Sequence, residues 1–157
     1  TTRDTLSLHD ALPISLVAKT PYGMPRRTAV GFDYNRVTML LAILERRLGM
    51  DFGAYDAYVN VVGGMRVTEP AADLAVAAAL VSSYRNRPIP HGVLVMGEVG
   101  LTGEVRRIAS PERRIKDAMN LGFKRFVLPM GKLSLDEPCN GIVQVKTLEE
   151  ALDKVFA

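Results

Sequence analysis

Apolar and polar positions in the first half of the chain follow the periods of a helix and of strands in turn. Residues 37–48 carry one apolar stripe, at positions 37, 40, 41, 44 and 48, with Asp33 at the N-cap and Gly49 at the C-cap. Residues 55–64 (YDAYVNVVGG) are rich in tyrosine and valine and end in two glycines, which is typical of a strand. The pattern therefore predicts a helix followed by a strand, after a short strand at residues 16–21.

A second helix follows, and then a buried strand. Pro70 lies in the first turn of a helix built mostly from alanine and valine, whose small side chains allow close packing on a sheet. Residues 91–100 (HGVLVMGEVG) form a continuous apolar run, which predicts one buried strand, and residues 102–108 predict its hairpin partner. Ser110 followed by Pro111 predicts the start of a third helix, with Ser110 as its cap.

The last third of the chain repeats the alternation. Residues 123–129 and 141–147 predict two strands, and Thr147 with Glu150 predicts a capping box for a final helix. Because helices and strands alternate throughout, we expect an α/β fold, a layered sandwich of one domain over residues 16–157.

The first fifteen residues break this pattern. Their apolar positions alternate only in part, and Asp4, Asp10 and Pro13 interrupt them. The stretch TTRDTLSLHDALPIS resembles the translation of a sequencing adapter, so we interpret residues 1–15 as a non-native leader. The alternative is a native, disordered arm.

Composition narrows the class of protein. The chain has 157 residues, 48% hydrophobic and 24% charged, as in soluble globular domains. No apolar run approaches the ~20 residues that span a bilayer, and the start lacks the pattern of a signal peptide. The single cysteine, Cys139, excludes an internal disulfide, so we expect a cytoplasmic protein.

Motifs for cofactor chemistry are missing. There is no Walker loop, and the glycines of GEVGLTGEV (97–105) open no helix and predict a hairpin turn. His9 and His91 have no second ligand at metal-binding spacing, and Cys139 lacks an evident histidine partner. We therefore expect no metal, no cofactor and an inert thiol, and we interpret Ser110 as a cap rather than a nucleophile.

Positive charge is concentrated in one part of the chain. Residues 104–125 hold seven basic and three acidic side chains, a net charge of +4, whereas residues 132–157 hold three and five, a net charge of −2. Such a patch attracts phosphate backbones, and arginine offers bidentate donors to phosphate. The alternative is a solvated helix face or ion pairs between subunits. The candidates for DNA contact are Arg26, Arg27, Arg106, Arg107, Arg113, Lys116, Lys124 and Arg125.

Some loops carry apolar side chains that a core does not need. Exposed apolar patches often mark interfaces between subunits. The alternative is that these loops fold back over a sheet edge. The residues are Tyr22, Met24, Met65, Met130 and Leu133.

Long motifs give the chain a family resemblance. The stretches EPAADLAVAAALVSSYRNRPIP (69–90), GEVGLTGEVRRI (97–108) and ERRIKDAMNLGFKRFVLP (112–129) resemble the proteolytic domain of Lon peptidases. The likeness covers about residues 25–147 and implies the layered Lon fold, of ribosomal protein S5 domain 2 type. PRRTAVGFDYNRV (25–37) with EPAADLA resembles in particular the C-terminal Lon-like domain of the RadA (Sms) family of bacterial DNA repair and recombination proteins.

The resemblance also shows what this chain lacks. Lon peptidases use a Ser-Lys dyad whose serine is the third residue of a G-P-S-A-G turn. The serine position falls on Ala71, and the lysine position falls on or beside Arg114. Alanine has no attacking atom, and an arginine stays protonated and cannot act as a base. The resemblance therefore implies a domain without peptidase activity.

For the RadA family, the resemblance implies a hexameric ring that contributes to DNA binding in branch migration. ATP hydrolysis and zinc binding would belong to upstream domains that this sequence does not contain. One alternative is a divergent Lon-type peptidase, for which Thr68 is the only hydroxyl near the turn. Another is a regulatory domain of a magnesium-chelatase-related ATPase, against which the PRRTAVGFDYNRV stretch argues.

Overall fold

The computed structural model describes residues 13–21, 23–62, 64 and 66–157. They form a mixed α/β fold, as the sequence predicts. The four α-helices are α1 (Tyr34–Leu48), α2 (Asp73–Arg85), α3 (Pro111–Asn120) and α4 (Leu148–Val155), and two 3₁₀ turns are η1 (Phe52–Ala54) and η2 (Pro70–Ala72). None of the helices in this part of the chain is long and apolar enough to cross a membrane.

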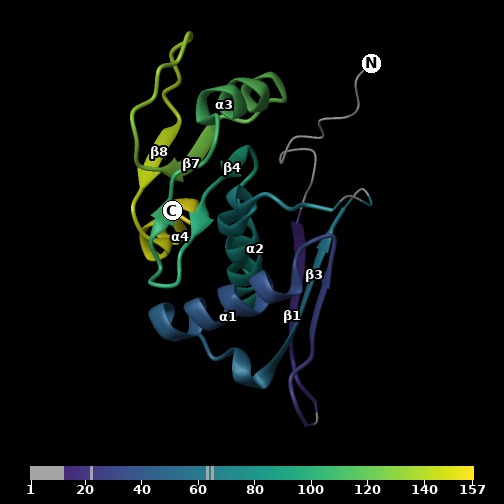
Figure 1. The fold of residues 1–157 in the computed structure, drawn as a ribbon. Coiled ribbons are helices and arrows are strands. Elements are labelled where there is room, and N and C mark those ends of the chain that lie inside the picture. Colours follow the sequence, from purple (N-terminus) through teal and green to yellow (C-terminus); the bar gives the residue numbers. More distant parts are fainter. Residues whose placement is uncertain (1–12, 22, 63, 65) are drawn as a thin grey trace.

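Two three-stranded sheets stand on either side of the central helix α2 (Figure 1). The first has the order β1-β3-β2, with β1 antiparallel and β2 parallel to β3. The second has the order β4-β7-β8 and is entirely parallel. The strands are β1 (Pro13–Lys19), β2 (Arg27–Val30), β3 (Tyr55–Val61), β4 (Val93–Val95), β7 (Arg125–Pro129) and β8 (Ile142–Val145), and a small hairpin pairs β5 (Glu98–Val99) with β6 (Val105–Arg106).

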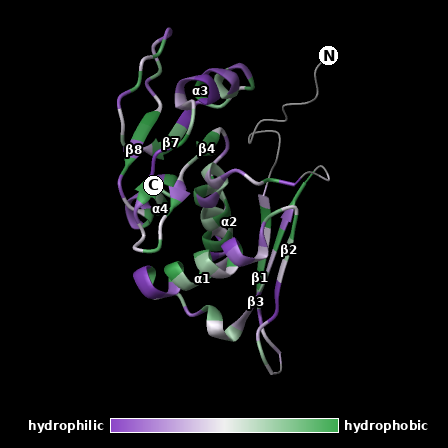
Figure 2. Cartoon of the chain, viewed as in Figure 1, coloured by the Kyte–Doolittle hydropathy of each residue, from purple (hydrophilic) through white to green (hydrophobic). Residues whose placement is uncertain are grey.

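Helix α2 is apolar along most of its length because it is covered on several sides (Figure 2). It contacts β1, β3, β4, β5, α1 and α4. The alanines and valines that dominate its sequence let these elements approach closely, and most of them lie in the main core. A second, smaller core fills the space between α3 and the second sheet, around Ile115, Phe126 and Leu128.

Local signals set the ends of several helices as expected. The Asp33 side chain accepts a hydrogen bond from the Arg36 N–H at the start of α1, and Gly49 ends α1 in the left-handed conformation. Thr147 caps α4 by accepting from the Glu150 N–H, but the Glu150 carboxylate accepts from the Lys146 N–H rather than from Thr147. The predicted capping box is therefore completed one residue earlier.

The structure also differs from the predictions at Ser110 and over residues 91–100. Ser110 occupies the N-cap position of α3 but has φ 51° and makes no side-chain capping bond. The predicted strand over residues 91–100 is two strands, because Gly97 between them pairs with the η2 turn. A Cβ at Gly97 would lie 2.8 Å from Val105 Cγ1, so a larger residue there would have to displace the Val105 side chain.

Strand β1 begins before the expected domain boundary. Pro13 pairs in register with Val61, and Ser15 with Val59. The last three residues of the interpreted leader thus belong to the first sheet, and residues 1–12 lie outside the described residues.

Candidate functional site

The turn that resembles the Lon nucleophile turn is held by the main chain. Ala71 lies in η2, is 5% exposed, and accepts a hydrogen bond from the Gly97 N–H at 2.9 Å. The Gly97 carbonyl accepts from the Leu74 N–H at 3.0 Å. The turn is therefore fixed against the second sheet, and its third residue presents only a methyl group.

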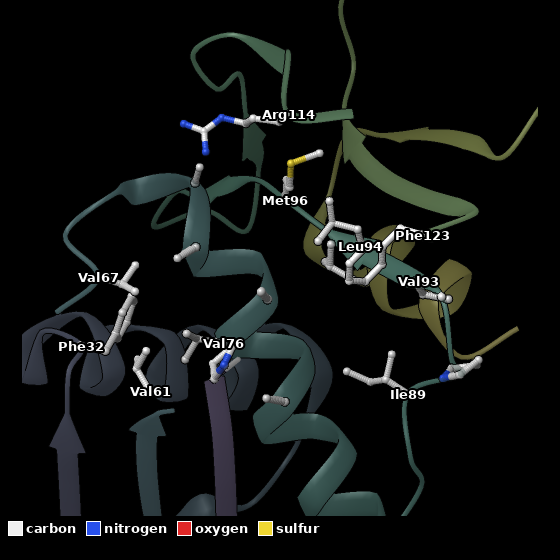
Figure 3. A pocket seen from close by; sticks show the side chains of 18 of the residues that line it. Phe32, Val61, Val67, Val76, Ile89, Val93, Leu94, Met96, Arg114 and Phe123 are labelled. Atoms are coloured by element: carbon white, nitrogen blue, oxygen red, sulfur yellow. The ribbon is translucent and has the colours of Figure 1, made fainter. Parts of the chain in front are cut away.

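Arg114 lies close to this turn although it comes from α3. Its Nη2 is 2.7 Å from Glu69 Oε2, and its Nε donates to the Ala109 carbonyl at 2.8 Å. Ala71 and Arg114 line the same groove, of about 460 Å³ (Figure 3). The structure thus brings the two dyad positions of the resemblance together, as an alanine and an ion-paired arginine.

The nearby hydroxyl groups lie elsewhere or are engaged. Thr68 is exposed and is not among the described residues that line the groove. Ser82 Oγ donates to the Arg87 carbonyl, and Ser83 Oγ accepts from the Val17 N–H at 2.8 Å, which ties α2 to β1. Sequence reasoning missed this role of Ser83, because nothing local joins positions 17 and 83.

A buried ion pair supports the same turn. Asp73, fully buried at the start of α2, accepts from Arg36 Nε at 2.7 Å, from a second Arg36 nitrogen, and from the Val99 N–H at 3.1 Å. The hydrogen bond to Asp73 raises the pKa of Arg36. Sequence reasoning missed this pair, because nothing local joins positions 36 and 73.

Three of the candidate DNA-contacting arginines are engaged by the protein. Arg27 donates to the main-chain carbonyls of Phe52 and Tyr55. Arg125 donates to the Lys154 carbonyl at 2.6 Å. Arg106 pairs with Glu104 at 2.7 Å and lies 3.7 Å from Glu98. The side chain of Arg106 is exposed to solvent although it is ion-paired. Arg27 instead connects β2 to η1 and β3.

Glu104 is the most strongly perturbed carboxylate in this region. The Thr102 hydroxyl, a backbone N–H and Arg106 bond to it and lower its pKa to about 2. Its carboxylate occupies the place where a Cβ on Gly100 would stand, which explains a glycine in the β5–β6 turn. The negative charge of Glu104 therefore offsets part of the positive charge of Arg106.

The exposed candidates that remain lie around α3 and at β2. Arg113 and Lys116 line a hollow that also contains Glu112, Asp136 and Glu137, so their charge is partly balanced. No side-chain hydrogen bond or ion pair within the described residues engages the exposed candidates Arg26, Arg107, Arg113, Lys116 and Lys124.

Arg107 has a cationic neighbour that the sequence analysis did not single out. Arg107 and Lys132 line a hollow of about 160 Å³ at the start of α3, and none of its described lining residues is acidic. Lys132 was missed because it begins the net-negative segment of the chain. We call Arg107 and Lys132 the cationic pair.

The apolar loop residues divide in the structure. Met24 is 88% and Met130 44% exposed, whereas Leu133 packs against the second core; Tyr22 and Met65 lie outside the described residues. The outer face of the first sheet also exposes apolar side chains. Ile14, Leu16 and Val30 are each 57% exposed there. Sequence reasoning missed them, because their strands are too short to show a clear alternation of apolar and polar residues.

No cluster of metal-binding side chains occurs among the residues that the structure describes. His91 lines the groove, and none of the other described residues that line it is a histidine or a cysteine. Cys139 is half-buried and packs against the second core, and His9 lies outside the described residues.

Comparison with known proteins gives the chain its family. Residues 17–132 match a family model described as subunit ChlI of Mg-chelatase, which is most of the chain. The chain belongs to the ChlI family. The name of this family model corresponds to the magnesium-chelatase-related proteins, which the sequence analysis gave as an alternative.

Curated relatives of this ChlI-family chain carry the name DNA repair protein RadA. Identity is 47% over 143 residues with the protein of Pseudomonas aeruginosa, 43% over 155 with that of Bacillus subtilis, and 45% over 139 with that of Haemophilus influenzae. These matches cover 90%, 94% and 88% of this chain and 32%, 34% and 30% of the relatives. The chain spans about a third of the length of the curated relatives it matches.

Proposed function

We propose that this chain is a catalytically inactive Lon-type scaffold and DNA-contacting domain of a RadA-type, ATP-dependent DNA repair and recombination protein of the cytoplasm. The observation that carries the proposal is that Ala71 and Arg114 line one groove. The relatives of the chain are named for DNA repair. ATP and zinc would be bound by other parts of the parent protein.

The chemistry of the two dyad positions supports inactivity. Acyl transfer by a dyad needs a nucleophile and a titratable base within hydrogen-bond reach. Ala71 offers a methyl group, and the guanidinium of Arg114 cannot take up a proton and is paired with Glu69. Thr68, the hydroxyl of the peptidase alternative, does not line the groove.

The cationic pair supports DNA contact. Arg107 and Lys132 stand beside each other without a carboxylate among the described residues of their hollow, so a phosphate would meet uncompensated positive charge. Such contacts release condensed counterions from DNA and need no base readout. Arg26 and Lys124 are also exposed, but Arg26 precedes β2 and Lys124 precedes β7, so neither lines the hollow of the cationic pair.

Self-association into a ring, which we propose to be a hexamer, would use the outer face of the first sheet. Ile14 and Leu16 of β1 and Val30 of β2 are exposed on this face, with Tyr58 and Asn60 of β3 between the two strands. Met24, in the loop between β1 and β2, is also exposed. Apolar patches of this kind are typical of subunit interfaces.

Two assays on the whole chain test this function. Binding to a labelled DNA duplex is measured at two salt concentrations, and casein turnover is measured at neutral pH. The proposal expects binding that weakens steeply with salt and no turnover above a buffer control. Undetectable DNA binding even at low salt would remove the DNA-contact part, and turnover abolished by Thr68→Ala would establish the peptidase alternative instead.

A further inference from the structure

The groove beside Ala71 runs along an unpaired strand edge. Val93 and Val95 pack into the main core on the α2 side, whereas Leu94 and Met96 pack into the second core on the α3 side. All four line the same groove. Residues from both faces of a strand can line one cavity only where the cavity follows the strand's edge.

The edge of β4 offers main-chain hydrogen-bonding groups to this groove. The Gly92 carbonyl accepts from the Arg125 N–H, and the Met96 N–H donates to the Val127 carbonyl, so even-numbered residues face β7. In a parallel ladder, the intervening Val93 and Val95 direct their N–H and C=O groups to the opposite side. No strand pairs with β4 on that side within the described residues.

The next odd-numbered residue shows what such groups require. Gly97 donates to the Ala71 carbonyl and accepts from the Leu74 N–H, so the η2 turn takes the place of a neighbouring strand there. At Val95 and Val93, which precede Gly97, the η2 turn does not pair with the strand edge, and these residues line the groove. An occupant that continues the same pattern must itself supply alternating main-chain donors and acceptors.

Most of the other described residues that line the groove are apolar. Ala72 of η2 and Ala75 and Ala79 of α2 line it. Phe32, Val61 and Val67 line it on the side of the first sheet (Figure 3). A volume of about 460 Å³ is in the range of ligand sites in proteins. These surfaces match small or β-branched side chains.

The two ends of the groove differ in charge. Among its described lining residues, Arg114 carries the only fixed charge, and it lies at the Met96 end, whereas Ile89 lies at the other (Figure 3). The partner of Arg114, Glu69, is half exposed, and the arginine's Nη1 has no hydrogen bond within the described chain. The Nη1 of Arg114 can therefore donate to a carboxylate at this end, beside the Nη2 that Glu69 already holds.

We propose that the groove binds an extended peptide segment by strand addition to β4, with apolar side chains over the α2 alanines and a carboxylate near Arg114. The occupant is a polypeptide because only a peptide backbone supplies the donors and acceptors that Val93 and Val95 require. This inference is independent of DNA binding, because it uses a different surface from the cationic pair.

A defined peptide tests the assignment. The probe is a labelled peptide of about seven alternating valine and threonine residues with a free C-terminal carboxylate, added to the ¹⁵N-labelled whole chain. We expect amide shifts at Val93, Val95 and Ala75. N-methylation of alternate peptide nitrogens should weaken binding by at least about fivefold, the value of one main-chain hydrogen bond. Ala75→Trp should abolish binding by filling the groove, whereas the matched control Ala42→Trp on α1 should not.

Two further arms identify the source of the carboxylate. An amidated peptide ending in aspartate and the same peptide ending in asparagine are compared with the free acid. Binding by the free acid or by the aspartate peptide, with loss for the asparagine amide and loss of that preference in Arg114→Gln, supports the proposal. Equal binding of all three, or full retention after N-methylation, overturns it.

Two other results would also overturn it. No peptide-induced shift at Val93 and Val95 in a chain that still binds DNA would exclude a peptide while leaving the proposed function intact. A concentration-dependent dimer lost in Ala75→Trp, without peptide binding, would assign the groove to a second copy of the chain.

Discussion

At the residue scale, one buried carboxylate organises the turn. Asp73 is fully buried and joins three elements, because Arg36 reaches it from α1 and the Val99 N–H from β5. A buried charge is costly unless it is paired and hydrogen-bonded. The Arg36–Asp73 ion pair therefore helps to hold η2, which ends next to Asp73, as well as packing α1 on α2.

Removing the arginine should destabilise the chain strongly. Arg36→Met leaves the Asp73 carboxylate buried without a charged partner, for which we expect a loss of about 3 kcal/mol in the free energy of unfolding. Urea unfolding measures it, with Arg46→Met on the exposed face of α1 as the matched control. A loss below about 0.5 kcal/mol, within the range of ordinary surface substitutions, would show that the pair contributes little.

Glu104 should give the stability of the chain a pH-dependent component. Its folded pKa of about 2 lies below the unfolded value, so its contribution is present above about pH 4.3 and is lost as the pH falls toward 2. Glu104→Gln should lower the free energy of unfolding at pH 7 by less than about 1 kcal/mol, because the side chain is partly exposed. The difference from wild type should shrink in urea titrations between pH 5 and 3. Asp153→Asn is the control, and a difference that grows on acidification would contradict the assignment.

At the element scale, the helices were predictable and the contacts between elements were not. The stripes and caps of α1 and α4 are local signals, and the structure buries them as expected. The break between β4 and β5 depends on Gly97 meeting Ala71, which is 26 positions away. Strand β1 was cut short in the prediction because Pro13 and its neighbours resemble an adapter and show weak alternation.

The same distinction applies to the site. The motif resemblance indicates Ala71 and Arg114, and the structure places both at one groove. Their equivalence to the Lon dyad positions stays a prediction. The engagement of Arg27 and Arg125 by main-chain carbonyls could not be predicted, because it requires three-dimensional neighbours. The same holds for Lys132, whose partner Arg107 stands in a segment of opposite net charge.

The contact between β7 and β8 should tolerate no side chain at Gly141. A Cβ there would lie 1.8 Å from the Lys124 carbonyl oxygen, and neither main chain can move aside without breaking the Phe126 N–H to Gly141 bond. Gly141→Ala should therefore destabilise the chain by about 1–3 kcal/mol. Thermal unfolding measures this loss. Gly131→Ala is the control, since its Cβ would meet only the Arg107 side chain, at 3.6 Å; equal effects of the two substitutions would contradict the close approach.

At the scale of the whole molecule, one chain carries the groove lined by Ala71 and Arg114, exposed apolar side chains on the first sheet, and the cationic pair. The curated relatives that it matches are about three times as long. The sheet face should carry self-association. Leu16→Lys with Val30→Lys, both on that face, should reduce the mass measured by sedimentation to that of a monomer without lowering the unfolding temperature. An unchanged assembly would exclude this face as the interface.

The most direct test of the central claim is the salt dependence of DNA binding by a charge-reversed chain. Anisotropy of a labelled duplex is followed across a salt series for wild type, Arg107→Glu with Lys132→Glu, and the control Lys146→Glu. If the cationic pair contacts phosphates, the double variant should bind more weakly to all sequences, and its log–log salt slope should fall by about 2, with the control near wild type. A slope unchanged in the double variant, or lowered equally by Lys146→Glu, would contradict DNA contact at this surface.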